Sequence, residues 1–400
     1  MTTAPGPSPI HRRVEEEPRP PRETLRFDPL LLLAVLGLVA CSLIVLTDAT
    51  RNDIPGSPHY YVVRQAVYAG VGLVLMVALT RMDYSRLREL KYGLYGAMIG
   101  LILLVLALGT AARGSRRALS LPFFSFQPAE LGKLLLILAL SAFMVDRLRR
   151  LRDRDTTARV MLMALVPAML VMLEPDLGSG MVYATIAVTV LFVAGTSWRH
   201  FVALAAIAGV GVTLTLVAAP AAGIQVLKPY QQQRLTGFLN PSSDPRNQTY
   251  QINQSRIAIG SGQKAGRGAA HATQTRLNFL PEHHTDFIFA VVGEEFGFLG
   301  AAVVLSLYAL LIWRTLRILT LAKNLYGALI AGGIVAMLMF QVFVNVGMTV
   351  GIMPITGVPL PLMSYGGSAV IVTLMAVGIL QSIHVQARVA GRGKGRALTI

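Results

Sequence analysis

The chain has 400 residues, of which 54% are hydrophobic and 14% are charged. A soluble domain has roughly 25% charged residues, so this composition excludes a soluble protein, whose surface would expose more apolar area than its charges could keep in water. The single cysteine, Cys41, excludes an internal disulfide framework and a zinc site built on several thiolates. The formal net charge of +16 is divided among short basic clusters between long apolar runs. This arrangement is typical of a membrane protein with several spans and argues against nucleic-acid binding, which needs a contiguous basic face.

Residues 1–28 hold six prolines, an acidic run and scattered arginines, and this composition predicts a disordered cytoplasmic tail. Ten apolar segments follow, and about 20 mostly apolar residues are enough to cross a hydrocarbon core. They cover residues 29–47, 61–79, 92–112, 131–145, 159–173, 177–197, 200–220, 287–312, 325–350 and 366–386.

The distribution of Lys and Arg predicts the orientation of these segments. Most basic residues fall on one side of the membrane if the N-terminus is cytoplasmic, and ten crossings then return the C-terminus to the same side. We therefore expect an all-α polytopic membrane protein with both termini inside. The predicted ten-helix domain covers residues 29–386, and a basic cytoplasmic tail covers residues 387–400.

A polar stretch precedes the fourth segment. Pro128 suits the first position of a helix, which places Glu130 and Lys133 three residues apart on one helix face. One interpretation is a surface pair that anchors the span. However, Arg116, Arg117 and Lys133 put three cations on the external side, which the positive-inside bias disfavours unless an anion is present. A phosphate-bearing ligand would supply that anion.

Residues 221–285 form a connection much longer than the others, and such loops are usually functional or disordered. The loop contains enough apolar side chains to lie on the membrane or to pack over the bundle, and we expect short amphipathic helices in it. It carries seven basic residues, among them Arg234, and two acidic ones. The excess positive charge suits an anionic substrate at the outer surface; pairing with lipid phosphates is the alternative.

The eighth segment opens with the polar sequence Glu282-His-His-Thr-Asp286. Asp286 lies where the polar loop becomes an apolar helix, and it is interpreted equally well as a helix N-cap or as a catalytic carboxylate. Glu282, His283, His284 and Asp286 are also candidate metal ligands. Because four residues so close in sequence rarely reach one ion, we favour Mg²⁺ or Mn²⁺ bound by Asp286 and Glu282 over zinc.

Three further regions are predicted to be structural. Asp176 is expected to cap the sixth helix. Gln341, Asn345 and Thr349 share one face of the ninth segment, where hydrogen bonding between helices is favoured over ligand contact. Residues 351–368, rich in proline and glycine, predict a rigid external hairpin-like segment that forms one wall of a cavity.

Five stretches resemble, in order and spacing, the motifs of the SEDS family (shape, elongation, division and sporulation) and favour its RodA branch. They are residues 126–133, 174–178, 234–241, 277–289 and 356–368. The resemblance implies a ten-helix peptidoglycan glycosyltransferase that polymerises lipid II during cell elongation, on the outer face of the bacterial cytoplasmic membrane. It also implies a class B penicillin-binding protein as partner, whose transpeptidase cross-links the new strands.

The resemblance places the family's essential aspartate on Asp286, and the acidic and basic positions of its Gln-Pro-Ser-Glu-x-x-Lys motif on Glu130 and Lys133. Ala129 replaces the usual serine of that motif. We expect Asp286 to remove a proton from an acceptor sugar hydroxyl while cations stabilise the departing undecaprenyl diphosphate. The expected substrate-binding residues are Arg116, Arg117, Glu130, Lys133, Arg234, Glu282 and His284.

Two other functions remain compatible with the residues. One is a lipid II flippase, and the other is a non-enzymatic scaffold of the cell-wall synthesis complex. Transporter sites tend to lie near the bilayer midplane, whereas the polar residues of this chain gather toward the outer face, which favours the enzyme.

Overall fold

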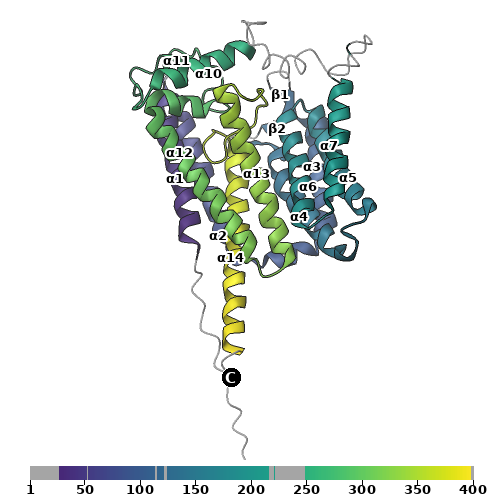
Figure 1. The fold of residues 1–400 in the computed structure, drawn as a ribbon. Helices are drawn as coiled ribbons and strands as arrows, with labels where there is room; N and C mark the ends of the chain where they lie inside the picture. The colour runs from purple at the N-terminus through teal and green to yellow at the C-terminus, as the bar shows by residue number, and fades with distance from the viewer. Residues whose placement is uncertain are drawn as a thin grey trace, which may run out of the picture.

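The computed structural model describes residues 27–51, 53–112, 115–120, 124–215, 220 and 248–397. Long helices run side by side and form a bundle (Figure 1). They are α1 (Pro29–Ala49), α2 (Tyr60–Arg81), α3 (Lys91–Leu108), α4 (Pro128–Asp146), α5 (Arg154–Leu173), α6 (Leu177–Val193), α7 (Trp198–Thr213), α12 (Ile288–Leu321), α13 (Leu325–Val350) and α14 (Gly367–Ala397). Two short 3-10 helices, Tyr84–Arg88 and Leu148–Arg150, lie in connections at one end of the bundle.

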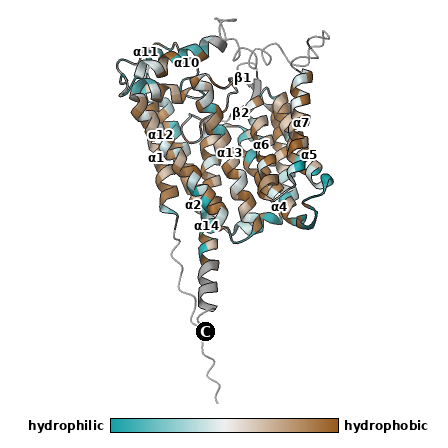
Figure 2. Cartoon of the chain, in the orientation of Figure 1, coloured by the Kyte–Doolittle hydropathy of each residue, from teal (hydrophilic) through white to brown (hydrophobic). Residues whose placement is uncertain are grey.

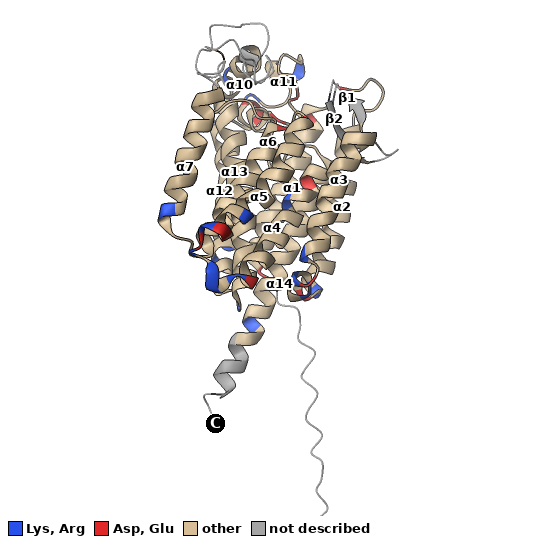
Figure 3. Cartoon of the chain, turned by 90° about the vertical axis from the view of Figure 1, so that its right-hand side faces the viewer, with Lys and Arg blue, Asp and Glu red and all other residues tan. Residues whose placement is uncertain are grey.

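Each of the ten predicted segments is a helix at its expected place. Within the described residues, eight helices are long and apolar enough to cross a membrane, while α6 and α7 are apolar but shorter. Figure 2 shows apolar residues along the bundle, and Figure 3 shows the charged residues gathered toward its ends. The class of polytopic helical membrane protein is therefore confirmed, whereas the number of crossings and the orientation stay predictions.

Several helix ends differ from the prediction; α12, for example, continues to Leu321 instead of residue 312. The third segment was expected to run to residue 112, but α3 ends at Leu108 because the backbone of Gly109 is extended (φ −61°, ψ 139°). The last helix, α14, continues to Ala397, so part of the expected basic tail extends the same helix.

A small antiparallel sheet between α3 and α4 was not predicted. Its strands β1 (Thr110–Ala112), β2 (Ser115–Ser120) and β3 (Ser125–Phe126) pair in the order β1-β2-β3. Strands this short carry too few residues for an alternating pattern to stand out from the apolar run before them. The sheet leads directly into Gln127, the residue before α4.

The helices differ in how deeply they are buried. α4, α13 and α14 lie mostly inside the bundle, whereas α3 and the part of α12 that follows residue 297 expose many apolar side chains. α14 packs against α2, and α12 packs against α1 and α13. In a membrane, the exposed apolar faces would contact lipid, which explains why so large an apolar surface is tolerated.

The described part of the long loop packs over the bundle. This is one of the two predicted arrangements; the other placed the loop on the membrane. It contains α10 (Gln248–Gly262) and α11 (Thr273–Arg276), and α10 contacts α12 and α13 (Figure 1). Residues 221–247 of this loop lie outside the described residues. We call the end of the bundle that carries α10 and α11 the loop end.

The helix α12 is broken at Gly297, whose backbone (φ 62°, ψ −156°) lies in a region used almost only by glycine. The break frees backbone groups on both sides, and the turn formed by residues 263–268 satisfies them. Its N–H groups donate to the carbonyls of the first part: Arg267 to Glu294 (2.9 Å) and Gly268 to Glu295 (3.0 Å). Its carbonyls accept from the second part: Gln263 from Phe298 (2.9 Å) and Lys264 from Leu299 (3.1 Å). The turn therefore supplies the backbone hydrogen bonds that α12 loses at its break.

Candidate functional site

Two loops meet at the loop end and carry the predicted catalytic residue. The Asp286 loop comprises residues 281–287, and the buried loop comprises residues 351–366. The buried loop was expected to be a hairpin-like segment on the external side, and the hairpin part of this prediction is wrong: the loop has no paired strands, and most side chains of residues 355–364 are buried. Its carbonyls instead accept hydrogen bonds from neighbouring helices, namely from Ser42 (2.7 Å), Gln65 (3.1 Å) and Tyr308 (2.5 Å).

Asp286 is half-buried. It does not occupy the predicted N-cap position, because α12 begins at Ile288 and the cap position falls on Phe287, whose side chain makes no capping hydrogen bond. The buried Asn345 amide donates to the backbone carbonyls of Asp286 (2.9 Å) and of Val358 (2.8 Å). One side chain on α13 therefore joins the Asp286 loop to the buried loop, whereas the prediction for Asn345 was a hydrogen bond to another helix.

Further hydrogen bonds hold the Asp286 loop against the buried loop. The Ser364 hydroxyl donates to the carbonyl of Thr285 (2.6 Å), and the backbone N–H of Tyr365 donates to the carbonyl of His284 (2.9 Å). Together with Asn345, these contacts fix three consecutive carbonyls, at residues 284–286. The backbone that carries the Asp286 side chain is thus held before any ligand binds.

The Asp286 carboxylate lies beside Gly357. A Cβ atom on Gly357 would be 3.7 Å from Asp286 Oδ2, and Gly357 has a positive φ of 73°. The neighbouring Glu282 also has a positive φ, of 54°, and its Oε2 accepts a hydrogen bond from the Thr285 hydroxyl (3.1 Å). Glu282 therefore interacts within its own loop.

Glu130 and Lys133 form an ion pair of 2.6 Å in the first turns of α4. The residues are 4% and 1% exposed, so the interpretation as a surface pair is wrong. The helix does begin at Pro128, as predicted. The Tyr183 hydroxyl donates to the carbonyl of Ala129 (3.0 Å), which joins this part of α4 to α6.

The N-termini of four helices meet around these loops. The Gln127 backbone N–H donates to Ser368 on α14 (2.9 Å), and the Gln127 side chain donates to Asp176 (3.3 Å), which caps α6 as predicted. The start of α6 contacts the buried loop, because a Cβ on Gly178 would lie 2.8 Å from the carbonyl of Thr356. The N-termini of α4, α6, α12 and α14 thus place partial positive charge at one end of the bundle, where anions are stabilised.

Glu294 and Glu295 have separate environments. Glu294 is fully buried, and its carboxylate accepts hydrogen bonds from the N–H groups of Gln274 (2.8 Å) and Thr275 (3.0 Å) in α11. Its role is therefore structural. Glu295 lines a cavity of about 460 Å³ together with Asp48, Arg51, Asp53 and Arg276.

A second cavity, of about 530 Å³, lies on the outer face of α2 and was not predicted. Tyr60, Val63, Val67 and Tyr68 line it, with Arg64 among them. The Tyr68 ring lies 6.4 Å from that of Tyr365, so the cavity adjoins the site. A charged residue inside an apolar span is the signal that could have indicated Arg64.

Two aromatic side chains orient His284. The rings of Tyr61 and Tyr365 lie 4.6 Å and 6.0 Å from the His284 imidazole. Burial raises the pKa of the Tyr365 phenol well above its ordinary value.

The structure does not test the remaining predicted arginines. Arg116 and Arg117 lie in β2, but their side chains are outside the described part of the chain, and Arg234 lies wholly outside it. Their contribution to the site stays a prediction.

The architecture defines a class: a polytopic helical membrane protein whose polar site is built from loops at one end of the bundle. Residues 24–389 match the profile of the family described as cell cycle protein, which groups FtsW, RodA and SpoVE. The chain belongs to this family, as its motifs predicted.

Relatives and solved structures agree with this assignment. The chain is 39% identical over 364 residues to the peptidoglycan glycosyltransferase MrdB of Escherichia coli K12, covering 90% of this chain and 94% of that protein. It is 35% identical over 358 residues to the stage V sporulation protein E of Bacillus subtilis, covering 88% and 94%. The fold is similar to a chain from a peptidoglycan synthase complex that coordinates polymerization and crosslinking (TM-score 0.76, 34% identity, covering 91% and 99%). It is also similar to the rod shape determining protein RodA of Thermus thermophilus (TM-score 0.65, 32% identity, covering 90% and 97%).

Proposed function

We propose that this protein is a peptidoglycan glycosyltransferase that polymerises lipid II into glycan strands during cell elongation. The observation that carries the proposal is the position of Asp286, on a backbone fixed by Asn345 and beside Gly357, at the end of the bundle where four helix N-termini meet. The names of the relatives support the same reaction.

In the proposed mechanism, Asp286 is the general base. Its carboxylate takes the proton from an acceptor sugar hydroxyl as that oxygen bonds to the anomeric carbon of the donor. The bond from that carbon to the diphosphate oxygen breaks, and undecaprenyl diphosphate leaves. A single displacement inverts the anomeric centre. Asn345 acts as a positioning residue, because it holds the carbonyl of Asp286 without contacting the reacting atoms.

The departing diphosphate needs positive charge. The helix N-termini supply part of it, and Arg64 lies in the adjoining cavity on α2. Arg116, Arg117 and Arg234 are the further candidates from the sequence. Lys133 could bind the diphosphate only if its ion pair with Glu130 opened, so the burial of this pair supports a positioning role for α4.

The apolar cavity on α2 suits an isoprenoid chain. Its lining combines valine and tyrosine side chains with one arginine, which fits a lipid tail that ends in a diphosphate at the membrane surface. We place the chain in the bacterial cytoplasmic membrane with the loop end outside, because the basic clusters then lie inside. A class B penicillin-binding protein is the proposed partner.

A divalent cation, Mg²⁺ or Mn²⁺, is part of the proposal. Asp286 and Glu282 are the residues that would hold it, and such an ion would stabilise the negative charge of the diphosphate. The two carboxylates belong to one loop, and the other residues of that loop stay bound through their backbone.

The test is polymerisation of fluorescent lipid II by the full-length chain in proteoliposomes, with and without the penicillin-binding protein. Asp286→Asn should lower the rate at least about 100-fold, because a general base contributes about 10²–10⁴. Asp155→Asn, at an exposed carboxylate of α5, is the control and should polymerise at the wild-type rate. Normal polymerisation by Asp286→Asn would refute the assignment. Translocation of lipid II without a glycan product would indicate a flippase, and neither activity would indicate a scaffold.

A further inference from the structure

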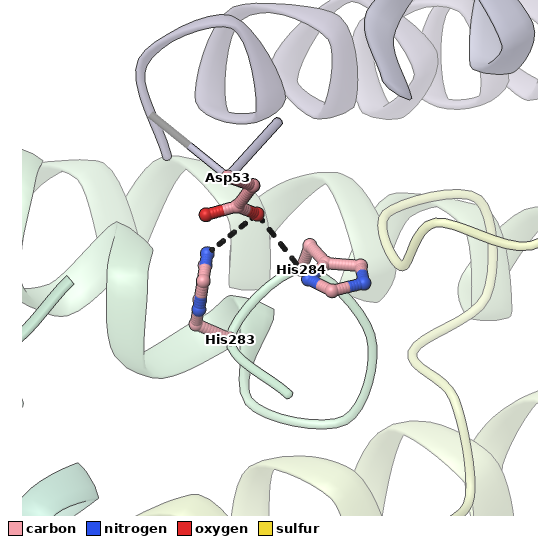
Figure 4. Close-up of side chains that lie close together, drawn as sticks. All are labelled: Asp53, His283 and His284. Carbon is pink, nitrogen blue, oxygen red and sulfur yellow. Dashed lines mark ion pairs between the residues drawn. The ribbon is translucent and has the colours of Figure 1, made fainter. Parts of the chain in front are cut away.

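Three side chains from two distant segments meet beside the Asp286 loop. Asp53 comes from the connection between α1 and α2, and His283 and His284 come from the Asp286 loop (Figure 4). The Asp53 Oδ2 atom lies 3.2 Å from His283 Nε2 and 3.7 Å from His284 Nδ1. In Figure 4 both imidazole rings are directed at this one oxygen. The three side chains are between 6% and 14% exposed, so water screens them little.

The hydrogen bond at the other nitrogen of His283 fixes the chemistry of Nε2. The His283 Nδ1 atom lies 3.1 Å from the carbonyl of Leu280. A carbonyl oxygen only accepts, so Nδ1 carries the proton of the neutral ring. Nε2 then presents a lone pair to the Asp53 carboxylate, and neither atom has a hydrogen-bond partner among the described residues. Two acceptors 3.2 Å apart repel each other unless a positive charge lies between them.

We propose that Asp53, His283 and His284 bind a divalent transition-metal ion, with Zn²⁺ as the favoured occupant. The ligand atoms all lie within 4.8 Å of one another. Tetrahedral zinc with bonds of about 2.0–2.1 Å separates its ligands by about 3.3 Å, close to the two distances from Asp53. Two imidazoles and one carboxylate favour zinc over Mg²⁺, which prefers oxygen ligands. The fourth position would be taken by water.

The surroundings have two features expected of such a site. The carbonyl of Leu280 orients His283 through the ring nitrogen opposite to the ligand atom, as the second layer of metal sites usually does. Asp53 also lines the cavity of about 460 Å³ whose other charged residues are Asp48, Glu295, Arg51 and Arg276, and this cavity gives an ion a route to the site.

The bound ion would link two segments of the protein. It would hold the connection between α1 and α2 against the loop that carries Asp286, two residues beyond His284. This site differs in its ligands from the Mg²⁺ or Mn²⁺ proposed at Asp286 and Glu282. Zinc binding does not depend on the glycosyltransferase activity, so the two proposals fail separately.

The first test measures zinc in the purified full-length protein in detergent, after chelation and reloading with zinc chloride. The wild type should retain about one zinc per chain, and added zinc should raise its melting temperature further than the same concentration of magnesium chloride, which the site at Asp286 and Glu282 also binds. Asp53→Asn and His283→Gln should lose both effects. His271→Gln, at an exposed histidine of the long loop, is the matched control and should keep both. Equal zinc content or equal melting shifts in all four proteins would overturn the proposal.

A second measurement uses only the wild type, in case the variants do not fold. Replacement of zinc by Co²⁺ should produce the intense visible absorption of a four-coordinate site, and zinc should abolish it by competition. Weak absorption of six-coordinate Co²⁺, or absorption that zinc does not displace, would show that an ion pair between Asp53 and a protonated His283 is the correct description.

Discussion

Replacement of Lys133 by methionine is expected to destabilise the protein strongly. The Lys133 ammonium lies 2.6 Å from Glu130 Oε1, and both side chains are at most 5% exposed. At an effective dielectric constant of about 20, this separation corresponds to an attraction of about 6 kcal/mol, part of which is offset by the desolvation of both charges. Lys133→Met leaves the Glu130 carboxylate buried without its partner, and we expect a loss of about 3–5 kcal/mol in the free energy of unfolding.

The measurement is unfolding in mixed micelles, with the free energy extrapolated to zero denaturant. Glu130→Gln alone leaves the ammonium buried and should cost a similar amount. The double variant Glu130→Gln/Lys133→Met removes both charges and should lie within about 1 kcal/mol of the wild type, because a buried pair is often replaceable as a unit. The reasoning is refuted if the two single effects add in the double variant, since additivity would mean that the charges do not interact.

Three further predictions concern the backbone around the site. Gly297→Ala should destabilise by about 3 kcal/mol in the same assay, because its backbone suits only glycine and a Cβ would lie 2.3 Å from the N atom of Gly266; Gly260→Ala, with open space around it, is the control and should have little effect. Gly357→Ala should lower the free energy of unfolding by about 1–2 kcal/mol, because the positive φ of Gly357 disfavours a side chain. If polymerisation then falls only as far as this loss of stability explains, the contact between residue 357 and Asp286 is unimportant. Asn345→Ala should lower the maximal polymerisation rate more than it raises the lipid II concentration at half-maximal rate, because two buried carbonyls lose their donor and the Asp286 loop loosens; an effect confined to that concentration would contradict the positioning role.

Hydropathy and length were sufficient to place all ten long helices, because a helix in a membrane must satisfy its backbone internally and be apolar along its whole length. The break in α12 escaped prediction because Gly297 lies within an apolar run that is also compatible with a continuous helix. The buried loop was misread for a related reason: its prolines and glycines indicate a turn, but not that Ser42, Gln65 and Tyr308 on other helices would satisfy it.

The candidate site was predicted in part. Asp286 and the pair Glu130–Lys133 were selected as ionisable residues next to apolar segments, and the structure places them at the starts of α12 and α4. Their burial depended on contacts made by residues far apart in the sequence. The same is true of Asp53, which is separated from the two histidines by more than 200 residues and carries no local signal of its own.

The break in α12 also affects the order in which the protein can assemble. The carbonyls and N–H groups at Gly297 remain open until residues 263–268 arrive, and open backbone groups are unfavourable against lipid. Those residues precede the helix in the chain, so a nascent protein already holds the closing segment when α12 emerges. An insertion between residues 268 and 288 would separate the two partners, whereas one before residue 248 would not. The surface loop thus belongs to the same cooperative folding unit as the helix beneath it.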